Sequence, residues 1–154
     1  MSEENLTKIH IDLPNNEDAG GESLWAEDLG NDLYRVRNVP FHAYGINFYD
    51  IVHAVPESEE LKPSVLKVYE YNGHKTLRVI FVDNSSQEER INRLKELNEF
   101  KAYHESADGT SFAIDVEPDG DYGRVCDILY AWENEGILSY ETCEARVEGR
   151  FDAD

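Results

Sequence analysis

The spacing of hydrophobic and polar residues changes near residue 85, from a period of two to a helical period. Before that point apolar and polar residues alternate, as they do from Ile9 to Leu13, and such runs recur about every ten residues. Short strands at this spacing are typical of a small, partly open β-barrel. The pattern predicts strands at residues 6–13, 23–28, 33–38, 47–55, 65–71 and 75–82.

The run at residues 76–82 is β-branched, aromatic and nearly free of charge. This composition is typical of a strand that is covered on both faces. Just before it, Asn72 and Gly73 have the composition of a type I′ turn. We therefore expect the strand at residues 65–71 to pair with this run as a hairpin.

From Ser86 onward the apolar residues recur at helical spacing. Ser86 and Glu89 match a capping box, in which each side chain satisfies a backbone amide at the start of a helix. A second helix is predicted to begin at Asp119 or Asp121 and to end before Gly136. Its apolar face would hold Tyr122, Val125, Cys126, Leu129 and Trp132.

A hairpin is predicted over Asp108 and Gly109, followed later by a last strand at residues 138–146. From residue 75 the order is therefore strand, helix, strand, strand, helix, strand, which is the ferredoxin-like arrangement. The apolar strands fit its two central positions and the charged strands fit its edges. We predict an α+β protein with a barrel-like subdomain at residues 1–74, a ferredoxin-like half at 75–146 and a frayed tail at 147–154.

The charge of the chain excludes several classes of partner. Its 154 residues carry 33 Asp and Glu against 14 Lys and Arg, which gives a net charge of −19. Residues 33–104 are balanced, so the excess lies at the two ends of the chain. Such a field repels nucleic acid and anionic membranes, and it accelerates encounter with a basic protein.

The sequence lacks the signals of export or membrane insertion. No apolar run approaches the ~18 residues that span a bilayer, and the first residues are acidic rather than basic and apolar. Only two cysteines are present, which favours a cytoplasmic protein with free thiols. We expect Cys126 in the core and Cys143 to face away from Tyr140, accessible to solvent.

No catalytic, phosphate-binding or dinucleotide-binding motif occurs, and the five histidines form no pair at helical spacing. We therefore predict no catalytic residue, no metal and no cofactor. If the protein were an enzyme, Asp50 and Asp115 would be its acid–base candidates.

Acidic and aromatic residues gather in the second predicted helix and the last strand. Glu133 and Glu135 lie at the carboxyl end of the helix, where the helix dipole does not favour negative charge. An acidic rim around aromatic anchors suits the binding of a basic protein. The predicted partner-binding residues are Asp119, Asp121, Asp127, Tyr130, Trp132, Glu133, Glu135, Glu141 and Glu144.

An alternative is a ligand-binding or regulatory module with a pocket between the two halves. Aromatic side chains in a loop can line such a groove, but they can also close the end of a small barrel. Asp115 lies on a central strand, where a carboxylate contacts a ligand or is hydrogen-bonded for structural reasons. The predicted pocket residues are Trp25, Phe41, Tyr44, Asp50 and Asp115.

Several motifs resemble a bacterial family of small acidic proteins catalogued as a domain of unknown function. The more specific ones are Glu22-Ser23-Leu24-Trp25-Ala26-Glu27 and Asn38-Val39-Pro40-Phe41 with Ala43-Tyr44-Gly45-Ile46. Less specific are Asp50-x-Val52, Ala113-Ile114-Asp115-Val116 and Glu135-Gly136-Ile137 with Tyr140-Glu141. The resemblance spans residues 22–142 and implies a bacterial, cytosolic protein that stands alone.

The resemblance implies no activity, so the expected function rests on charge and size. Small acidic proteins are similar in character to immunity proteins that neutralise basic nuclease toxins. We therefore expect a non-enzymatic protein of the immunity or inhibitor type, with a basic partner such as a cognate toxin. Mimicry of nucleic acid by spaced carboxylates is a variant of this hypothesis.

Overall fold

The computed structural model describes residues 6–16, 20–106 and 108–152. The described part contains nine β-strands, two α-helices and one 3₁₀-helix, so the predicted α+β class is confirmed. All but one of the strand pairings are antiparallel.

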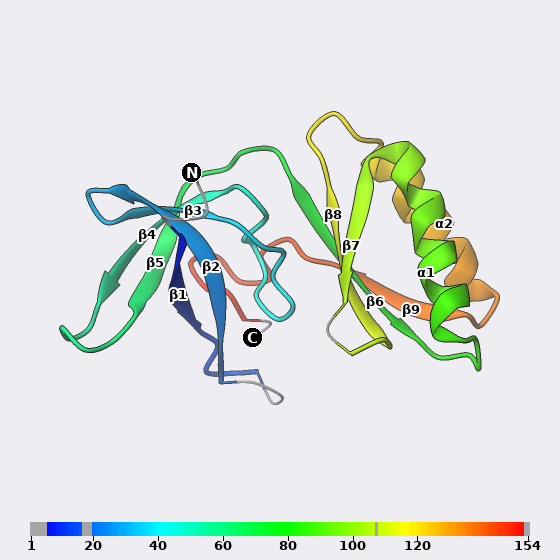
Figure 1. Ribbon diagram of the computed structural model, residues 1–154, viewed down its shortest axis with the longest axis horizontal. Coiled ribbons are helices and arrows are strands. Elements are labelled where there is room, and N and C mark those ends of the chain that lie inside the picture. Colours follow the sequence, from blue (N-terminus) through cyan, green and yellow to red (C-terminus); the bar gives the residue numbers. More distant parts are fainter. Residues whose placement is uncertain (1–5, 17–19, 107, 153–154) are drawn as a thin grey trace. The chain divides into compact units, whose positions relative to one another are not determined.

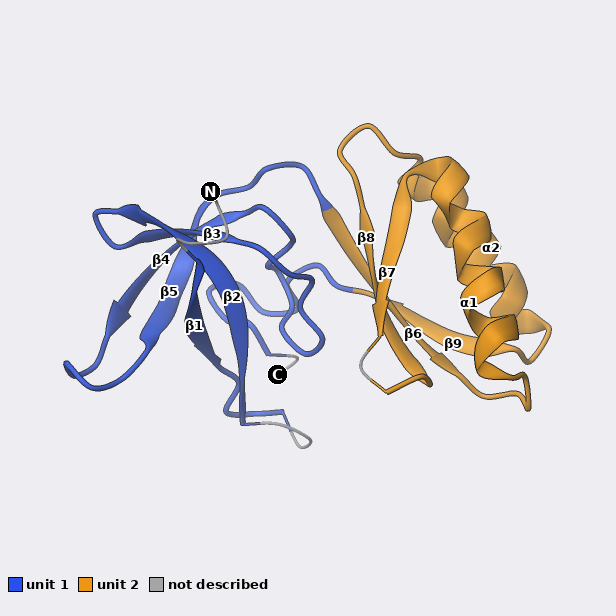
Figure 2. Cartoon of the chain, in the orientation of Figure 1, with its two compact units in different colours: residues 1–74, 143–154 blue, residues 75–142 orange. Residues whose placement is uncertain are grey.

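The chain divides into two compact units (Figure 2). Unit 1 comprises residues 1–74 and 143–154, and unit 2 comprises residues 75–142. The chain therefore leaves unit 1 after residue 74 and returns to it at residue 143.

Five strands of unit 1 form a closed barrel in sequential order (Figure 1). Successive strands pair antiparallel, and the barrel closes through one parallel pairing, between His10 and Ser64. The strands are β1 (Leu6–Asp12), β2 (Gly21–Gly30), β3 (Leu33–Val36), β4 (Ile51–Pro56) and β5 (Pro63–Glu70).

The barrel core follows the alternation of the sequence. Ile9 and Ile11 of β1 are buried and lie in register with Leu24 and Glu22 of β2. Two residues of the loop at 38–46, Ala43 and Ile46, belong to the same core. The loop thus supplies aliphatic side chains to the barrel core, whereas its aromatic residues Phe41 and Tyr44 are half-buried and lie outside this core.

Unit 2 is a four-stranded sheet in the order β7-β8-β6-β9, with both helices on one of its faces (Figure 1). As expected, the apolar strands β6 and β8 are central and the charged strands β7 and β9 are edges. The strands are β6 (Lys75–Phe81), β7 (Ala102–Ser106), β8 (Ser111–Val116) and β9 (Leu138–Thr142). The helices are α1 (Gln87–Lys95), the 3₁₀-helix η2 (Glu96–Phe100) and α2 (Tyr122–Asn134).

The helix ends confirm the capping residues expected from the sequence. The Ser86 side chain accepts a hydrogen bond from the Glu89 amide, and the Glu89 carboxylate accepts one from the Ser86 amide. Asp121 caps α2 by accepting from the Arg124 amide at 3.0 Å. After α2, Gly136 has a φ of +79°, and the Ile137 amide donates to the Trp132 carbonyl at 3.0 Å, as in a Schellman motif.

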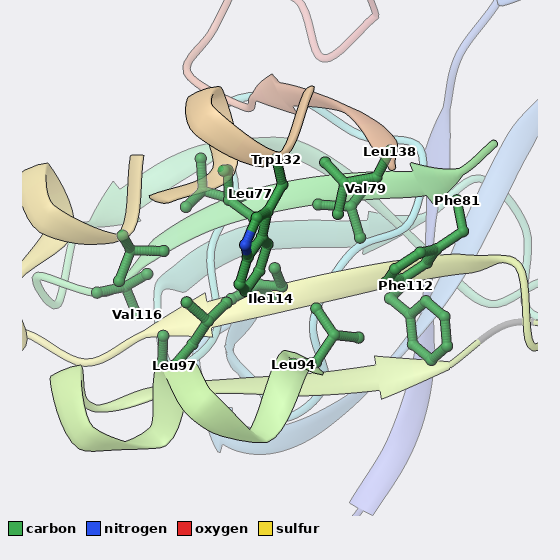
Figure 3. Packing of buried hydrophobic residues seen from close by; sticks show 13 residues of the cluster. Leu77, Val79, Phe81, Leu94, Leu97, Phe112, Ile114, Val116, Trp132 and Leu138 are labelled. Carbon is green, nitrogen blue, oxygen red and sulfur yellow. The ribbon is translucent and has the colours of Figure 1, made fainter. Parts of the chain in front are cut away.

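The core of unit 2 lies between the helices and the sheet (Figure 3). Phe112 of β8 is 1% exposed and meets Phe81 edge-to-face, with ring centroids 5.6 Å apart. Leu94 and Leu97 cover this side of the sheet from α1 and η2. Of the apolar face predicted for the second helix, Val125, Leu129 and Trp132 are buried, whereas Tyr122 and Cys126 are half-buried.

The predicted hairpin over Asn72 and Gly73 is wrong. Strand β5 pairs with β4 and β1, whereas β6 pairs with β8 and β9 in the other unit. Gly73 does have a positive φ of 93°, but Asn72 does not, and both are required by a type I′ turn. The Asn72 amide instead donates to the Asp50 carboxylate at 2.9 Å.

The predicted frayed tail at residues 147–154 is also wrong where the structure describes it; residues 153–154 lie outside the described part. The Tyr44 amide donates to the Phe151 carbonyl at 2.8 Å, and Phe151 packs against the barrel core. The Asp152 carboxylate is 1% exposed and accepts from the Asn15 amide at 2.9 Å. The returning segment belongs to the barrel unit from residue 143, so the last strand ends at Thr142 rather than at residue 146.

Replacing Gly45 by alanine should destabilise unit 1 more than replacing Gly30. Both glycines have a positive φ, +82° and +86°, which costs an alanine about 1–2 kcal/mol. A Cβ at Gly45 would lie 3.1 Å from the Cβ of Ala145, whereas a Cβ at Gly30 meets no atom within 4 Å. We expect about 1–3 kcal/mol of additional loss for Gly45→Ala, measured by urea unfolding. Equal losses for the two variants would show that the returning segment can move away from the loop.

Candidate binding surface on helix α2 and strand β9

Helix α2 turns Val125, Leu129 and Trp132 into the core and leaves its opposite side in solvent. On that side Tyr130 is 57% exposed, one helical turn from Asp127 and one from Glu133. Residues three apart on a helix are neighbours, so the tyrosine lies between two carboxylates. We call Asp127, Tyr130, Glu133 and the half-buried Tyr140 of β9 the α2 patch.

The other three residues of the α2 patch act electrostatically on Tyr140. Burial raises the pKa of the Tyr140 phenol, and the neighbouring Cys126, Glu133, Tyr130 and Asp127 raise it further. Negative charge close to a phenol disfavours its ionised form, which explains the direction of this pKa shift. The patch therefore presents two tyrosine side chains within an acidic surrounding.

Glu133 has a structural role that the sequence did not reveal. Its carboxylate accepts a hydrogen bond from the backbone amide of Tyr140 at 3.2 Å. Strand β9 is an edge of the sheet, and an unpaired amide on an edge is a template for unwanted pairing. Glu133 therefore has a local role although the helix dipole disfavours its charge, because it covers part of the edge.

The acids at the start of α2 are engaged elsewhere. Asp119 forms an ion pair with Lys101, and hydrogen bonding to this lysine lowers the pKa of the Asp119 carboxyl. Asp121 caps the helix. Because a helix rises ~1.5 Å per residue, these two acids lie about 20 Å from Glu135 at the other end of α2. The structure brings only Asp127, Tyr130 and Glu133 together along the helix.

Trp132 is not an exposed anchor, which corrects the sequence prediction. It is 8% exposed within the core of unit 2, and the Arg93 guanidinium lies 5.1 Å from its ring centroid. Glu141 forms an ion pair with Arg78 at 3.0 Å. Glu144 is exposed but belongs to unit 1, so it is not part of the α2 patch.

The residues predicted to line a ligand pocket do not form one site within either unit. Asp115 belongs to unit 2, on β8 in register with Thr76 and Tyr103, whereas the other four belong to unit 1. Trp25 is 47% exposed, with the Lys8 ammonium 4.9 Å from its ring centroid. Tyr44 is half-buried under the Arg146 guanidinium, at 4.7 Å. Neither cavity described for unit 1 is lined by Trp25, Phe41, Tyr44 or Asp50.

Asp50 is fully buried and holds together two segments of unit 1. One carboxylate oxygen accepts from the Asn47 amide at 2.8 Å and from its side-chain nitrogen at 3.2 Å. The other accepts from the Asn72 amide at 2.9 Å. Burial raises the pKa of Asp50, although these hydrogen bonds and the nearby His74 oppose the shift. The turn at residues 47–50 explains why strand β4 begins at Ile51, later than predicted.

Glu22 was not singled out by the sequence, yet it organises the loop at residues 38–46. Its carboxylate accepts hydrogen bonds from three successive amides, those of Phe41, His42 and Ala43, at 2.6–3.0 Å. Three amides that converge on one carboxylate form an anion-binding nest. The motif that contains Glu22 therefore holds the motif that contains Phe41 in place. The two motifs lie about twenty residues apart, so the sequence alone does not reveal this contact.

The described residues contain no group of three or more His, Cys, Asp or Glu side chains that could hold a metal ion. Cys126 is half-buried and Cys143 is 2% exposed, and neither forms a disulfide within the part of the chain that the structure describes. The expectation that Cys143 is accessible is wrong, because the segment after β9 packs into unit 1. Among the described residues, no helix is both long enough and apolar enough to cross a membrane.

The fold and the surface together define an α+β protein that joins a β-barrel unit to a sheet covered by two helices, with an acidic and aromatic surface on the latter. The chain belongs to the family described as Domain of unknown function (DUF4265), whose model matches residues 22–140. This confirms the expectation of a family without an established function. No curated protein matches the sequence.

A solved structure described as a hypothetical protein from Neisseria gonorrhoeae has a similar fold. The two chains are 17% identical with a TM-score of 0.77, and the match covers 90% of this chain and 94% of that chain. At this identity the likeness concerns the fold alone. It shows that both units recur together in one other chain.

Proposed function

We propose that this protein is a non-enzymatic binding protein of the immunity or inhibitor type, which masks a basic partner such as a nuclease toxin in the bacterial cytoplasm. The observation that carries the proposal is the α2 patch, where an exposed tyrosine lies between two carboxylates on a rigid helix. Tyrosine is a common anchor of interfaces, and an acidic surrounding steers a cationic partner toward it.

We further propose that unit 2 is of the ferredoxin-like class and unit 1 of the small-barrel class, as part of a bacterial family with the motifs given above. The order β-α-β-β-α-β with the sheet order β7-β8-β6-β9 supports the first assignment. The sheet below α2 would hold the helix rigid. Such rigidity favours partner binding, because anchor side chains on rigid elements lose little conformational freedom on binding.

The remaining predicted partner residues would act over a longer range. Asp121, Glu135 and Glu144 add negative charge that steers association over about a Debye length. Asp119 and Glu141 contribute less, because ion pairs with Lys101 and Arg78 offset part of their charge. Under this proposal the α2 patch provides contact and these acids provide attraction. Trp132 has no part in either, because it is buried.

Neutralising the patch should slow association with a basic partner. The proposal expects a basic, toxin-like protein to be encoded beside this one in the genome; its purified form is the partner to use. The variant is Asp127→Asn with Glu133→Gln. We expect the association rate to fall about three- to tenfold at low salt and its salt dependence to flatten. The side-chain carbonyl that Glu133→Gln introduces can still accept from the Tyr140 amide, so the edge strand keeps its cover.

The matched control for this experiment is Glu96→Gln with Glu99→Gln, which removes the same charge from exposed residues of η2. It should change the association rate less than about twofold, and Tyr130→Ala should instead raise the dissociation rate about tenfold. Association that is indifferent to ionic strength would contradict the proposal. So would equal slowing by the patch variant and the control.

A further inference from the structure

A second feature lies in unit 1 and is independent of the α2 patch. A cavity of about 200 Å³ lies between strand β5 and the returning segment at residues 143–152. Its walls are largely apolar and include Leu66, Val68, Tyr71 and Phe151. Leu66 and Tyr71 are 54% and 64% exposed, so apolar surface faces solvent at this position.

The charge of this cavity is opposite to that of the protein. Lys67 and Arg150 are among its lining residues, and no Asp or Glu lines it, although the chain has 33 acids and only 14 Lys and Arg. The charged side chains that line this concave place are therefore both basic, and the effect of a charge is stronger beside low-dielectric walls than in open solvent.

The two cations differ in how they are held. The Arg150 guanidinium is fixed by the buried Asp152 carboxylate, with nitrogen–oxygen distances of 3.1 and 3.2 Å. Lys67 takes part in no ion pair with another described residue. Asp152 offsets the charge of Arg150, so Lys67 is the lining cation that has no ion-pair partner among the described residues.

We propose that this cavity binds a small organic monoanion, a carboxylate joined to a compact apolar body. The carboxylate would meet the Lys67 ammonium, and the apolar body would lie against Leu66, Val68, Tyr71 and Phe151. Pockets for drug-sized ligands begin at about 300 Å³, so the ligand is a single ring or a short branched chain. The proposal goes beyond the protein-binding function, because it concerns unit 1 alone.

Titration with benzoate tests the proposal, with benzamide as the neutral molecule of nearly the same shape. We expect benzoate to shift the backbone amide signals of Lys67, Val68 and Phe151 in nuclear magnetic resonance spectra, and benzamide to bind about tenfold more weakly. Benzoate that binds no better than benzamide would overturn the proposal. Shifts confined to other parts of the chain, or no shifts at millimolar benzoate, would do the same.

Variants distinguish binding at this cavity from non-specific attraction of anions to lysine side chains. Lys67→Gln should weaken benzoate binding about tenfold, because the charge-assisted contact is lost. Lys62→Gln removes an exposed charge that lines a different cavity of unit 1 and should leave binding unchanged. Because Leu66 is exposed, Leu66→Glu should fold and abolish binding by placing a carboxylate in the cavity. Equal weakening by Lys67→Gln and Lys62→Gln would overturn the assignment.

Discussion

Replacing Phe112 by alanine is expected to lower the free energy of unfolding by about 3–5 kcal/mol. The side chain is 1% exposed and packs between the sheet and the helices of unit 2. Its ring meets Phe81 and His104 edge-to-face, with centroids 5.6 and 5.7 Å away, so truncation removes both contacts and leaves a cavity. Chemical denaturation followed by tryptophan fluorescence measures the loss, because Trp132 lies in the same core.

Tyr130→Ala is the control for this prediction. The two side chains are similar in size, but Tyr130 is 57% exposed on α2, so its truncation should cost less than about 1 kcal/mol. A loss for Phe112→Ala as small as that for Tyr130→Ala would contradict the described packing of unit 2. The control also shows that Tyr130→Ala remains folded, which its use in binding experiments requires.

Replacing Asp50 by alanine is expected to cost about 2–4 kcal/mol. The carboxylate accepts hydrogen bonds from the Asn47 amide, the Asn47 side chain and the Asn72 amide. Alanine leaves these donors without their acceptor, and each buried unsatisfied donor costs about 1–3 kcal/mol before relaxation. Glu59→Ala, which removes an exposed carboxylate of the same unit, should change stability by less than about 0.5 kcal/mol.

The cost of Asp50→Ala should depend on pH. Burial raises the folded-state pKa of Asp50 above its ordinary value of 3.8, so the folded protein holds this proton more tightly than the unfolded chain. The part of the stability that is linked to this proton is fully present below the ordinary pKa and is lost as the pH rises through the raised one, whereas the hydrogen bonds accepted by the carboxylate remain. The difference in stability between wild type and Asp50→Ala should therefore be larger near pH 4 than near pH 7. A difference that grows with pH would show that the hydrogen bonds, rather than burial, dominate this pKa.

The helix ends and the central strands of unit 2 could be predicted from local sequence signals. The capping box at Ser86, the cap at Asp121 and the glycine after α2 each act within a few residues, so sequence alone reveals them. The positions of β6 and β8 followed from composition, because central strands are covered by neighbours on both edges and tolerate little charge. Neither argument required a contact between distant residues.

Two features that the sequence did not predict are contacts between residues far apart in the chain. Asn72 and Gly73 have turn composition, but the carboxylate of Asp50 engages Asn72 across about twenty residues. Glu22 engages the amides at residues 41–43 over a similar separation. A side chain that binds distant backbone leaves no periodic pattern, so neither role was visible in the sequence.

The candidate surface was predicted in part. Composition drew attention to acids and aromatics near α2, and the helical period correctly placed Trp132 on the buried stripe. The same period excludes Trp132 as an anchor, because a side chain on the buried face of the helix does not reach a partner at the exposed face. The sequence could not show that Glu141 lies outside the α2 patch. Its ion pair with Arg78 depends on the pairing of β6 with β9, which joins residues far apart in the chain.

The return of the chain to the barrel at residue 143 makes unit 2 an insertion nested inside unit 1. Truncation after residue 74 would take Phe151 and Asp152 from the barrel together with the sheet and helices, so such a fragment should not fold to the same barrel. Replacing residues 75–142 by a short flexible linker keeps both segments of unit 1, residues 1–74 and 143–154. The entropy of loop closure changes little with loop length, so this variant should fold as an autonomous barrel. A different domain inserted at the same position should therefore leave the barrel of unit 1 unchanged.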